Sequence, residues 1–278
     1  MSVLSDKTKI EWCDYTFNPW TGCTKVSPAC ANCYAESWAK RSGLVKWGKG
    51  QPRRRTAEAN WRKPLKWNKE AEEAGDRPKV FCASLADWLD DEVPIGWLVD
   101  LLCLIRRTPH LDWLLLTKRP ENWIERIGKA RCSKEGFEES GLWLWLDEWL
   151  DGEPPANVWV GTTVESQEMA EARIPELVEI PARVRFLSCE PLLERLDLWG
   201  WICEPIVPLV DWVIVGGESG PGCREFRPEW ARSIQAQCEA AEVPFFFKQM
   251  GGVRKPFAPI PDDLMVREFP QVEGGRHE

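Results

Sequence analysis

The sequence predicts an α/β fold, a partial (β/α) TIM-like barrel of about six to seven parallel strands. Three observations support this prediction. Short apolar runs recur at intervals of roughly 30 residues, which is typical of βα units. Each run ends in polar residues and precedes a stretch with helical apolar spacing. The chain of 278 residues is long enough to bury the core of one such barrel.

Strands are predicted at six apolar runs and at one further position before Cys23. The runs lie at 80–83, 111–116, 158–160, 184–187, 212–215 and 245–247. Helices are predicted between them, for example at 97–105 after Pro94 and at 230–238 after Pro228. A proline in the first turn followed by an i, i+4 apolar face indicates a helix start.

One domain accounts for most of the chain in this prediction. We expect residues 1–252 to form a single barrel, with an inserted helical segment at 128–155 on its surface. That segment is the longest gap between predicted strands, and it is rich in tryptophan. Residues 253–278, which are rich in proline and glycine, are expected to form a C-terminal tail.

Eleven cysteines and only two histidines restrict the possible chemistry. No apolar run reaches the roughly 20 residues that span a bilayer, and the N-terminus lacks the apolar core of a secretory signal. We therefore expect a cytoplasmic protein with no membrane association, whose thiols stay reduced and bind metal or pack in the core. The scarcity of histidine argues against a Ser-His-Asp relay and against a zinc site rich in imidazole.

The strongest local motif is the loop at 22–36, in which Cys23, Cys30 and Cys33 have the spacing C-x6-C-x2-C. Three thiolates can hold three irons of a 4Fe–4S cubane and leave the fourth iron open, where S-adenosylmethionine (SAM) can bind. The alternative is a structural zinc, with Cys13 as the fourth thiolate. The spacing alone leaves both hypotheses open.

Polar residues follow all six of the apolar runs. In a βα barrel these positions meet at the carboxyl mouth, where active sites are built. Each residue taken singly could be a cap or a turn residue. A structural barrel stabilised by zinc would not need polar residues at all six positions, so the full set indicates an active site. The predicted cofactor-binding residues are Tyr34, Ser84, Asp87, Thr163, Glu165, Gly216, Gly217 and Glu218, and the predicted catalytic residues are Lys118, Glu190 and Lys248. The glycine pair is expected to expose backbone N–H groups as a nest for a carboxylate or a ribose.

A basic segment at 40–69 has a charge of +10 in a chain whose net charge is −8. Its arginines alternate with Trp47, Trp61 and Trp67, which predicts a surface for nucleic acid or a nucleotide. The alternative is a solvated loop whose tryptophans pack on the barrel.

Taken together, these motifs resemble a bacteriophage and prophage family of unknown function that is described as radical-SAM-like and grouped near spore photoproduct lyase. The matching segments lie at 9–12, 18–19, 22–36, 81–87, 116–120, 157–161, 164–165, 185–192, 213–220 and 244–249. The resemblance implies a partial barrel of the radical-SAM type, a cluster on the three cysteines and SAM at the mouth, but no reaction. Two features differ from most radical SAM enzymes: the first cysteine spacing is long, and no Gly-Gly-Glu follows the strand that ends near Ser84.

The leading hypothesis is a radical-SAM-type enzyme that generates a 5′-deoxyadenosyl radical with electrons from an external reductant. Its substrate is unknown, and nucleic acid or a nucleotide is the first substrate hypothesis. Two alternatives stay open: a non-catalytic nucleic-acid-binding protein with a four-thiolate zinc, and an iron–sulfur binding or sensing protein without SAM turnover.

Overall fold

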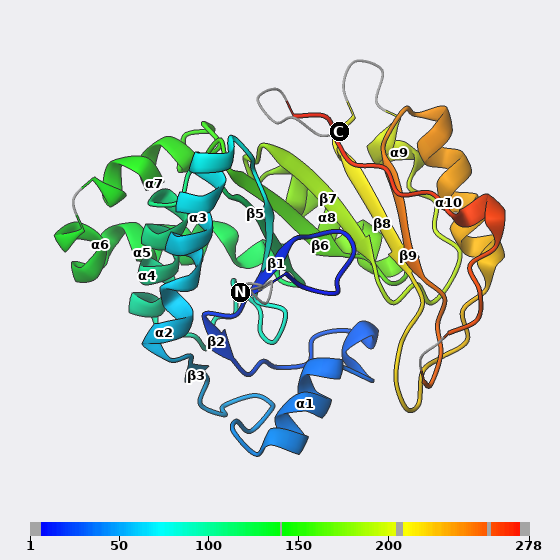
Figure 1. Cartoon of the computed structure of the whole chain (residues 1–278), viewed down its shortest axis with the longest axis horizontal. Coiled ribbons are helices and arrows are strands. Elements are labelled where there is room, and N and C mark those ends of the chain that lie inside the picture. Colours follow the sequence, from blue (N-terminus) through cyan, green and yellow to red (C-terminus); the bar gives the residue numbers. More distant parts are fainter. Residues whose placement is uncertain (1–6, 140, 204–207, 255–256, 273–278) are drawn as a thin grey trace.

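A parallel sheet of seven strands, curled into an open half-barrel, forms the centre of the molecule (Figure 1). The computed structural model describes residues 7–139, 141–203, 208–254 and 257–272. The strands follow one another in chain order as β1 (Tyr15–Phe17), β4 (Lys79–Cys82), β5 (Asp112–Thr117), β6 (Val158–Thr163), β7 (Val184–Cys189), β8 (Trp212–Gly216) and β9 (Phe245–Gln249). This confirms the predicted α/β partial barrel, including the strand before Cys23.

Both faces of the sheet are buried, as expected for parallel strands that read as continuous apolar runs. Alternate residues enter two separate cores. The concave face holds an aromatic cluster that includes Trp12, Phe81, Phe186 and Trp212, and the convex face packs against the helices. Cys82 and Cys189 belong to this convex core and do not point into the barrel.

The helices connect the strands in the predicted βα rhythm. They are α1 (Tyr34–Ser42), α2 (Glu58–Trp61), α3 (Lys63–Ala74), α4 (Ile95–Arg106), α5 (Trp123–Cys132), α8 (Gln167–Val178), α9 (Trp199–Ile202) and α10 (Pro228–Ala240), with short 3-10 turns η1 (Pro28–Cys30), η2 (Pro120–Asn122) and η3 (Asp262–Leu264). Helices α4 and α10 begin at the two prolines that predicted them. Figure 1 shows α1 and the small antiparallel pair of β2 (Trp20–Thr21) and β3 (Arg54–Arg55) below the sheet, with α2 beside the pair.

The inserted segment contains two helices of its own. The range predicted at 128–155 begins inside α5, and the added helices are α6 (Lys134–Glu138) and α7 (Leu142–Leu150). The buried Trp149 of α7 packs against Trp123 of α5, with ring centroids 4.5 Å apart. The insertion is therefore attached to the barrel through an aromatic contact, while Trp143 remains exposed.

The first and the last described segments of the chain both pack on the half-barrel. Trp12 packs against Phe81 in the concave core, with ring centroids 4.6 Å apart. The described part of the predicted tail runs along β9, where the Phe247 N–H donates to the Val266 carbonyl (2.9 Å) and the Glu268 N–H donates to the Phe245 carbonyl (3.0 Å). Residues 255–256 and 273–278 of that tail lie outside the described residues. Among the helices that the structure describes, none has the length and apolarity needed to cross a bilayer.

Candidate functional site

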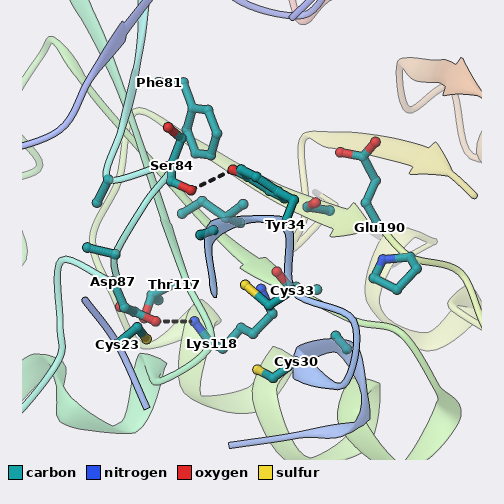
Figure 2. Close-up of a pocket in the computed structure, with 18 of the residues that line it drawn as sticks. Cys23, Cys30, Cys33, Tyr34, Phe81, Ser84, Asp87, Thr117, Lys118 and Glu190 are labelled. Atoms are coloured by element: carbon teal, nitrogen blue, oxygen red, sulfur yellow. Dashed lines mark hydrogen bonds between the residues drawn. The ribbon is translucent and has the colours of Figure 1, made fainter. Parts of the chain in front are cut away.

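A cavity of about 410 Å³ lies at the carboxyl mouth of the half-barrel, above the aromatic core. Its volume falls in the range of small-molecule sites. All of the predicted site residues line it except Glu165 and Gly216. Figure 2 shows the cysteines of the loop on one side of this cavity and Glu190 on another, with Tyr34 between them.

The cysteine loop connects β2 to α1. Cys30 ends the 3-10 turn η1 and is buried, whereas Cys23 and Cys33 are half-buried. Gly22, just before the first cysteine, has a φ of +106°, and a Cβ there would lie 3.0 Å from the Val45 side chain. A glycine is therefore required for the loop to turn at this point.

The donor set has the composition that a 4Fe–4S cubane needs. The three thiols line one cavity, and a cubane takes its cysteines on three different irons, farther apart than the ligands of one zinc. Within the described ranges, no group of three or more His, Cys, Asp or Glu side chains is arranged so that it could hold a metal ion. Three thiolates without a fourth protein ligand leave one iron open.

Cys13 does not complete a four-thiolate site. It lies in the concave apolar core beside Trp12 and Phe81, and its thiol donates to the Ile10 carbonyl (3.8 Å). Burial, strengthened by the nearby Asp14, raises the pKa of the Cys13 thiol to about 12. The zinc hypothesis needs this residue as a thiolate at the loop, and its place in the apolar core does not suit that role.

The first contact that holds the cysteine loop comes from Asp87 and Arg119, at the ends of β4 and β5. The Arg119 Nη1 lies 3.0 Å from the Asp87 Oδ2, and its Nη2 donates to the Thr24 carbonyl (2.8 Å). Both side chains are almost fully buried. Asp87 also accepts hydrogen bonds from the Thr117 hydroxyl (2.7 Å) and the Lys118 N–H (2.9 Å), as Figure 2 shows for Lys118.

The second contact comes from Glu165, which follows β6 and is completely buried. Its Oε1 accepts a hydrogen bond from the Ala29 N–H of the loop (2.9 Å). Its Oε2 lies 3.0 Å from Arg173 Nη1, which also donates to the Thr163 carbonyl (2.8 Å). Both oxygens are used, and this explains why Glu165 does not line the cavity.

The third contact comes from Glu218, which follows β8. It accepts hydrogen bonds from the Asn32 side chain (3.0 Å) and the Arg224 N–H (2.8 Å), and Arg224 in turn donates to the Pro28 carbonyl (2.9 Å). Burial alone raises the pKa of Glu218, but the hydrogen bonds from Arg224 and Asn32 outweigh it and hold the pKa below its usual value.

Three carboxylate–arginine pairs thus hold one loop at three points. They are Asp87–Arg119, Glu165–Arg173 and Glu218–Arg224, and their carboxylates follow alternate strands of the sheet. The sequence predicted the three carboxylates as cofactor-binding residues. The contacts observed here are with the cysteine loop, and any contact with SAM stays a prediction.

Tyr34 and Ser84 connect α1 to the end of β4. The Tyr34 hydroxyl donates to the Ser84 carbonyl (2.5 Å), as Figure 2 shows. Ala83 has a φ of +63°, a conformation that L-residues rarely adopt and that often occurs at functional sites. This turn directs the Ser84 carbonyl towards α1, and Asn18 fixes the turn by accepting from the Leu85 N–H (2.7 Å).

Glu190 and Lys248 form an ion pair on the cavity wall, with Nζ 2.9 Å from Oε1 and 3.1 Å from Oε2. Gly216 leaves room for this pair, because a Cβ there would lie 2.7 Å from the Glu190 Oε1. In the predicted nest at the glycine pair, one of the two N–H groups is already used. The Gly217 N–H donates to the Gln249 carbonyl (3.0 Å), and a Cβ at Gly217 would lie 2.2 Å from the Gly251 nitrogen, so this glycine permits a close backbone crossing.

Two further polar groups of the cavity have no protein partner within the part of the chain that the structure describes. The Thr163 Oγ1 is buried without a hydrogen bond, and Lys118 is half-buried and forms no ion pair. Unpartnered buried polar groups are rare in native proteins, and they are typical of sites that bind a ligand.

Part of the predicted nucleic-acid surface is instead structural. Arg53 is buried and forms an ion pair with Asp90, with Nε 2.7 Å from Oδ2. Trp61 and Trp67 are also buried, and Trp67 stacks on Tyr15 with ring centroids 4.3 Å apart. Trp61 and Trp67 thus pack as the alternative expected, whereas Arg53 is buried and not solvated. Trp47 differs from them, because it is half-buried and lines the cavity.

Sequence reasoning missed the basic partners of the three carboxylates and Asn32. Arg119 stood in a motif singled out for its neighbour Lys118, and Arg224 lies only six residues after Glu218. Arg173 faces Glu165 from the second turn of α8. The available signal was that a buried carboxylate needs a cation, but the sequence does not show which arginine provides it.

Comparisons with known proteins agree with this architecture. A family model described as "Protein of unknown function (DUF5131)" matches residues 7–274. No curated protein matches the sequence. A solved structure of a spore photoproduct lyase variant with a Cys-to-Ser substitution matches with a TM-score of 0.51 and 10% sequence identity, over 90% of this chain and 80% of that chain. At this identity the match shows a shared fold alone.

Proposed function

The chain belongs to the DUF5131 family of proteins of unknown function, and from that premise we propose that it is a radical-SAM-type iron–sulfur enzyme. The proposal rests on one observation: Cys23, Cys30 and Cys33 line a single cavity at the carboxyl mouth of a parallel half-barrel. The fold shared with spore photoproduct lyase supports it, because the sequence motifs resemble a radical-SAM-like family grouped near that enzyme.

The three cysteines would hold a 4Fe–4S cluster. A cluster held there would supply one-electron reduction of SAM, with the electron drawn from an external reductant, and so the radical chemistry that the proposal assigns to this site. The protein's own contribution is to position the groups and to exclude water.

The remaining polar groups of the cavity suit the charged and hydroxyl groups of SAM and its substrate. Lys118 and Lys248 can bind a carboxylate, and Glu190 can bind an ammonium group. The Thr163 hydroxyl can donate or accept one hydrogen bond, which nothing within the described residues provides. We assign substrate and cofactor contacts to these groups and loop support to Asp87, Glu165 and Glu218.

Metal analysis of anaerobically purified protein tests the cluster. We expect iron and sulfide in equal amounts, about four of each per chain. The triple variant C23S/C30S/C33S should lose them, whereas the control Cys13→Ala should keep them, since Cys13 lies in the apolar core. Zinc in place of iron, or iron retained by the triple variant, would remove the proposal.

A SAM cleavage assay then tests the chemistry. Reduced, cluster-loaded protein should convert SAM to 5′-deoxyadenosine, measured by mass spectrometry, and the triple variant should not. A loaded and reduced cluster that yields no 5′-deoxyadenosine would identify an iron–sulfur binding or sensing protein instead.

We also propose nucleic acid or a nucleotide as the substrate, and the cytoplasm, where thiols remain reduced, as the compartment. The support comes from the part of the 40–69 segment that stays accessible. Arg41, Lys46 and Lys49 are exposed, and the neighbouring Trp47 lines the cavity. Exposed cations beside an aromatic ring suit the phosphates and bases of a single strand. Binding of a fluorescent single-stranded oligonucleotide that weakens steeply with salt is the expected result, and salt-independent or absent binding would contradict it.

A further inference from the structure

The sulfur of Cys23 accepts hydrogen bonds from an arginine. The Arg119 Nη1 lies 3.5 Å and its Nη2 lies 3.6 Å from the Cys23 Sγ. Within the residues that the structure describes, the sulfurs of Cys30 and Cys33 accept no such bond. One corner of the loop therefore carries a fixed positive charge that the other two corners lack.

Arg119 cannot turn away from this sulfur without losing other bonds. Its guanidinium also donates to the Asp87 Oδ2 (3.0 Å) and the Thr24 carbonyl (2.8 Å), and the residue is only 4% exposed. Asp87 is fixed in turn by donors that include the Leu89 N–H (3.0 Å). The cation is thus held against the sulfur, and its Nη1 contacts both the Cys23 Sγ and the Asp87 Oδ2.

We propose that Arg119 raises the reduction potential of the cluster through Cys23, and that Asp87 limits this effect. Reduction adds negative charge to the cluster, and a cation that donates hydrogen bonds to a ligand sulfur stabilises the reduced form. The Asp87 carboxylate, which accepts from the same Arg119 Nη1, carries the opposite charge and opposes this effect. Arg119 is a positioning residue that acts through a ligand. This inference rests on the proposed function, since it requires the cluster.

Two substitutions should shift the potential in opposite directions. Arg119→Gln removes the cation, so the ratio of reduced to oxidised cluster at a fixed potential should fall about tenfold, equivalent to about 59 mV for a one-electron couple. Asp87→Asn keeps the cation and removes its counter-charge, so the potential should rise. Arg119→Lys keeps the charge, so the potential should fall less in this variant than in Arg119→Gln.

The measurement is a potentiometric titration of the reconstituted protein, followed by the electron paramagnetic resonance signal of the reduced cluster. Arg224→Gln is the matched control, because Arg224 supports the same loop through the Pro28 carbonyl and Glu218 and contacts no sulfur. Its potential should equal that of the wild type. If the role of Arg119 were purely structural, Arg119→Gln would contain less cluster, and the potential of Asp87→Asn would not shift in the opposite direction.

The outcomes separate this inference from the proposed function. A wild-type protein that takes up no cluster would refute both. A loaded wild type whose potential is unchanged in both Arg119→Gln and Arg119→Lys, or a shift of the same sign in Arg119→Gln and Asp87→Asn, would refute the role of Arg119 alone. If Arg119→Gln does not fold, Asp87→Asn alone decides. A higher reduction potential in that variant supports the inference, and an unchanged or lower potential contradicts it.

Discussion

Glu165 accepts a hydrogen bond from the backbone N–H of Ala29, 2.9 Å away in space and 136 positions earlier in the sequence. The carboxylate is completely buried, and its other oxygen pairs with Arg173. A buried charge is tolerated only when it is compensated in this way. The cysteine loop therefore takes its position from the sheet and not from its own sequence alone.

Glu165→Gln should strongly destabilise the protein. The substitution leaves Arg173 buried without its anion, and breaking a buried pair from one side costs about 3–5 kcal/mol. Urea denaturation, read from the shift in the midpoint at constant slope, measures the loss. The matched control is Glu225→Gln, which breaks the exposed pair with Arg227 and should change the midpoint little. Equal shifts in the two variants would mean that Glu165 does not hold the loop.

Gly216→Ala should impair chemistry while leaving the cluster in place. A methyl group at residue 216 would lie 2.7 Å from the Glu190 Oε1, so the Glu190–Lys248 pair must move. The cysteines are not touched. We expect wild-type iron content and at least about a tenfold loss of SAM cleavage, as small misplacements in an active site cost that much or more.

The control for this substitution is Gly128→Ala, at a half-buried position of α5 where a Cβ meets nothing within 4 Å. It should keep full SAM cleavage and gain slight stability, since alanine favours the helix by about 1 kcal/mol. SAM cleavage at the wild-type rate in Gly216→Ala would exclude a role for the Glu190–Lys248 pair.

Glu218 should make stability depend on pH. Burial raises the pKa of Glu218, but the hydrogen bonds from Arg224 and Asn32 lower it by more. The pKa in the folded state therefore lies below that in the unfolded chain. Such a group contributes stability above the unfolded pKa, and the contribution disappears as the pH falls through the folded value. The stability gap between wild type and Glu218→Gln should be largest near neutral pH and should close below about pH 4.3.

Chemical denaturation of the metal-free protein across this range measures that gap. Arg224→Gln removes the main donors to Glu218, so adding Glu218→Gln in that background should give a much smaller pH-dependent difference. A gap that stays constant with pH would show that the Glu218 charge does not stabilise the fold.

The sequence predicted the sheet well because each strand is a local signal. The run 212–215, for example, has the continuous apolar character of a strand buried on both faces, and β8 is found there. The segment around Trp67 was harder to assign. Pro64, Trp67 and Ala71 have the spacing of one helix face, and they are buried together in α3, but the lysines between them also suited a nucleic-acid surface.

The site was only partly predictable because its key contacts are made between distant segments. The polar residues after the strands gather at the mouth, as βα topology requires, yet no local pattern links Arg173 to the cysteine loop. Gly217 illustrates the same limit. A glycine is needed at this position because the Gly251 backbone passes beside it. This close approach depends on the pairing of β8 with β9, which no local sequence pattern shows.

The last prediction separates cations that bind substrate from one that supports the fold. Lys46 and Lys49 are exposed on the segment beside Trp47, whereas Arg53 is buried, paired with Asp90, and donates to the Gly48 and Gln51 carbonyls (3.1 and 2.9 Å). Lys46→Gln and Lys49→Gln should each weaken binding of a single-stranded oligonucleotide and reduce its salt slope by about 0.7, without loss of stability.

Arg53→Gln should behave in the opposite way, because the buried Asp90 loses its cation and the loop carrying Gly48 loses its anchor. We expect a lower denaturation midpoint and, at a temperature where the variant is still folded, an unchanged salt slope. Lys134→Gln, on α6 of the inserted segment, is the control and should change neither quantity. A salt slope that falls in Arg53→Gln but not in Lys46→Gln or Lys49→Gln would show that the exposed cations are not the phosphate contacts.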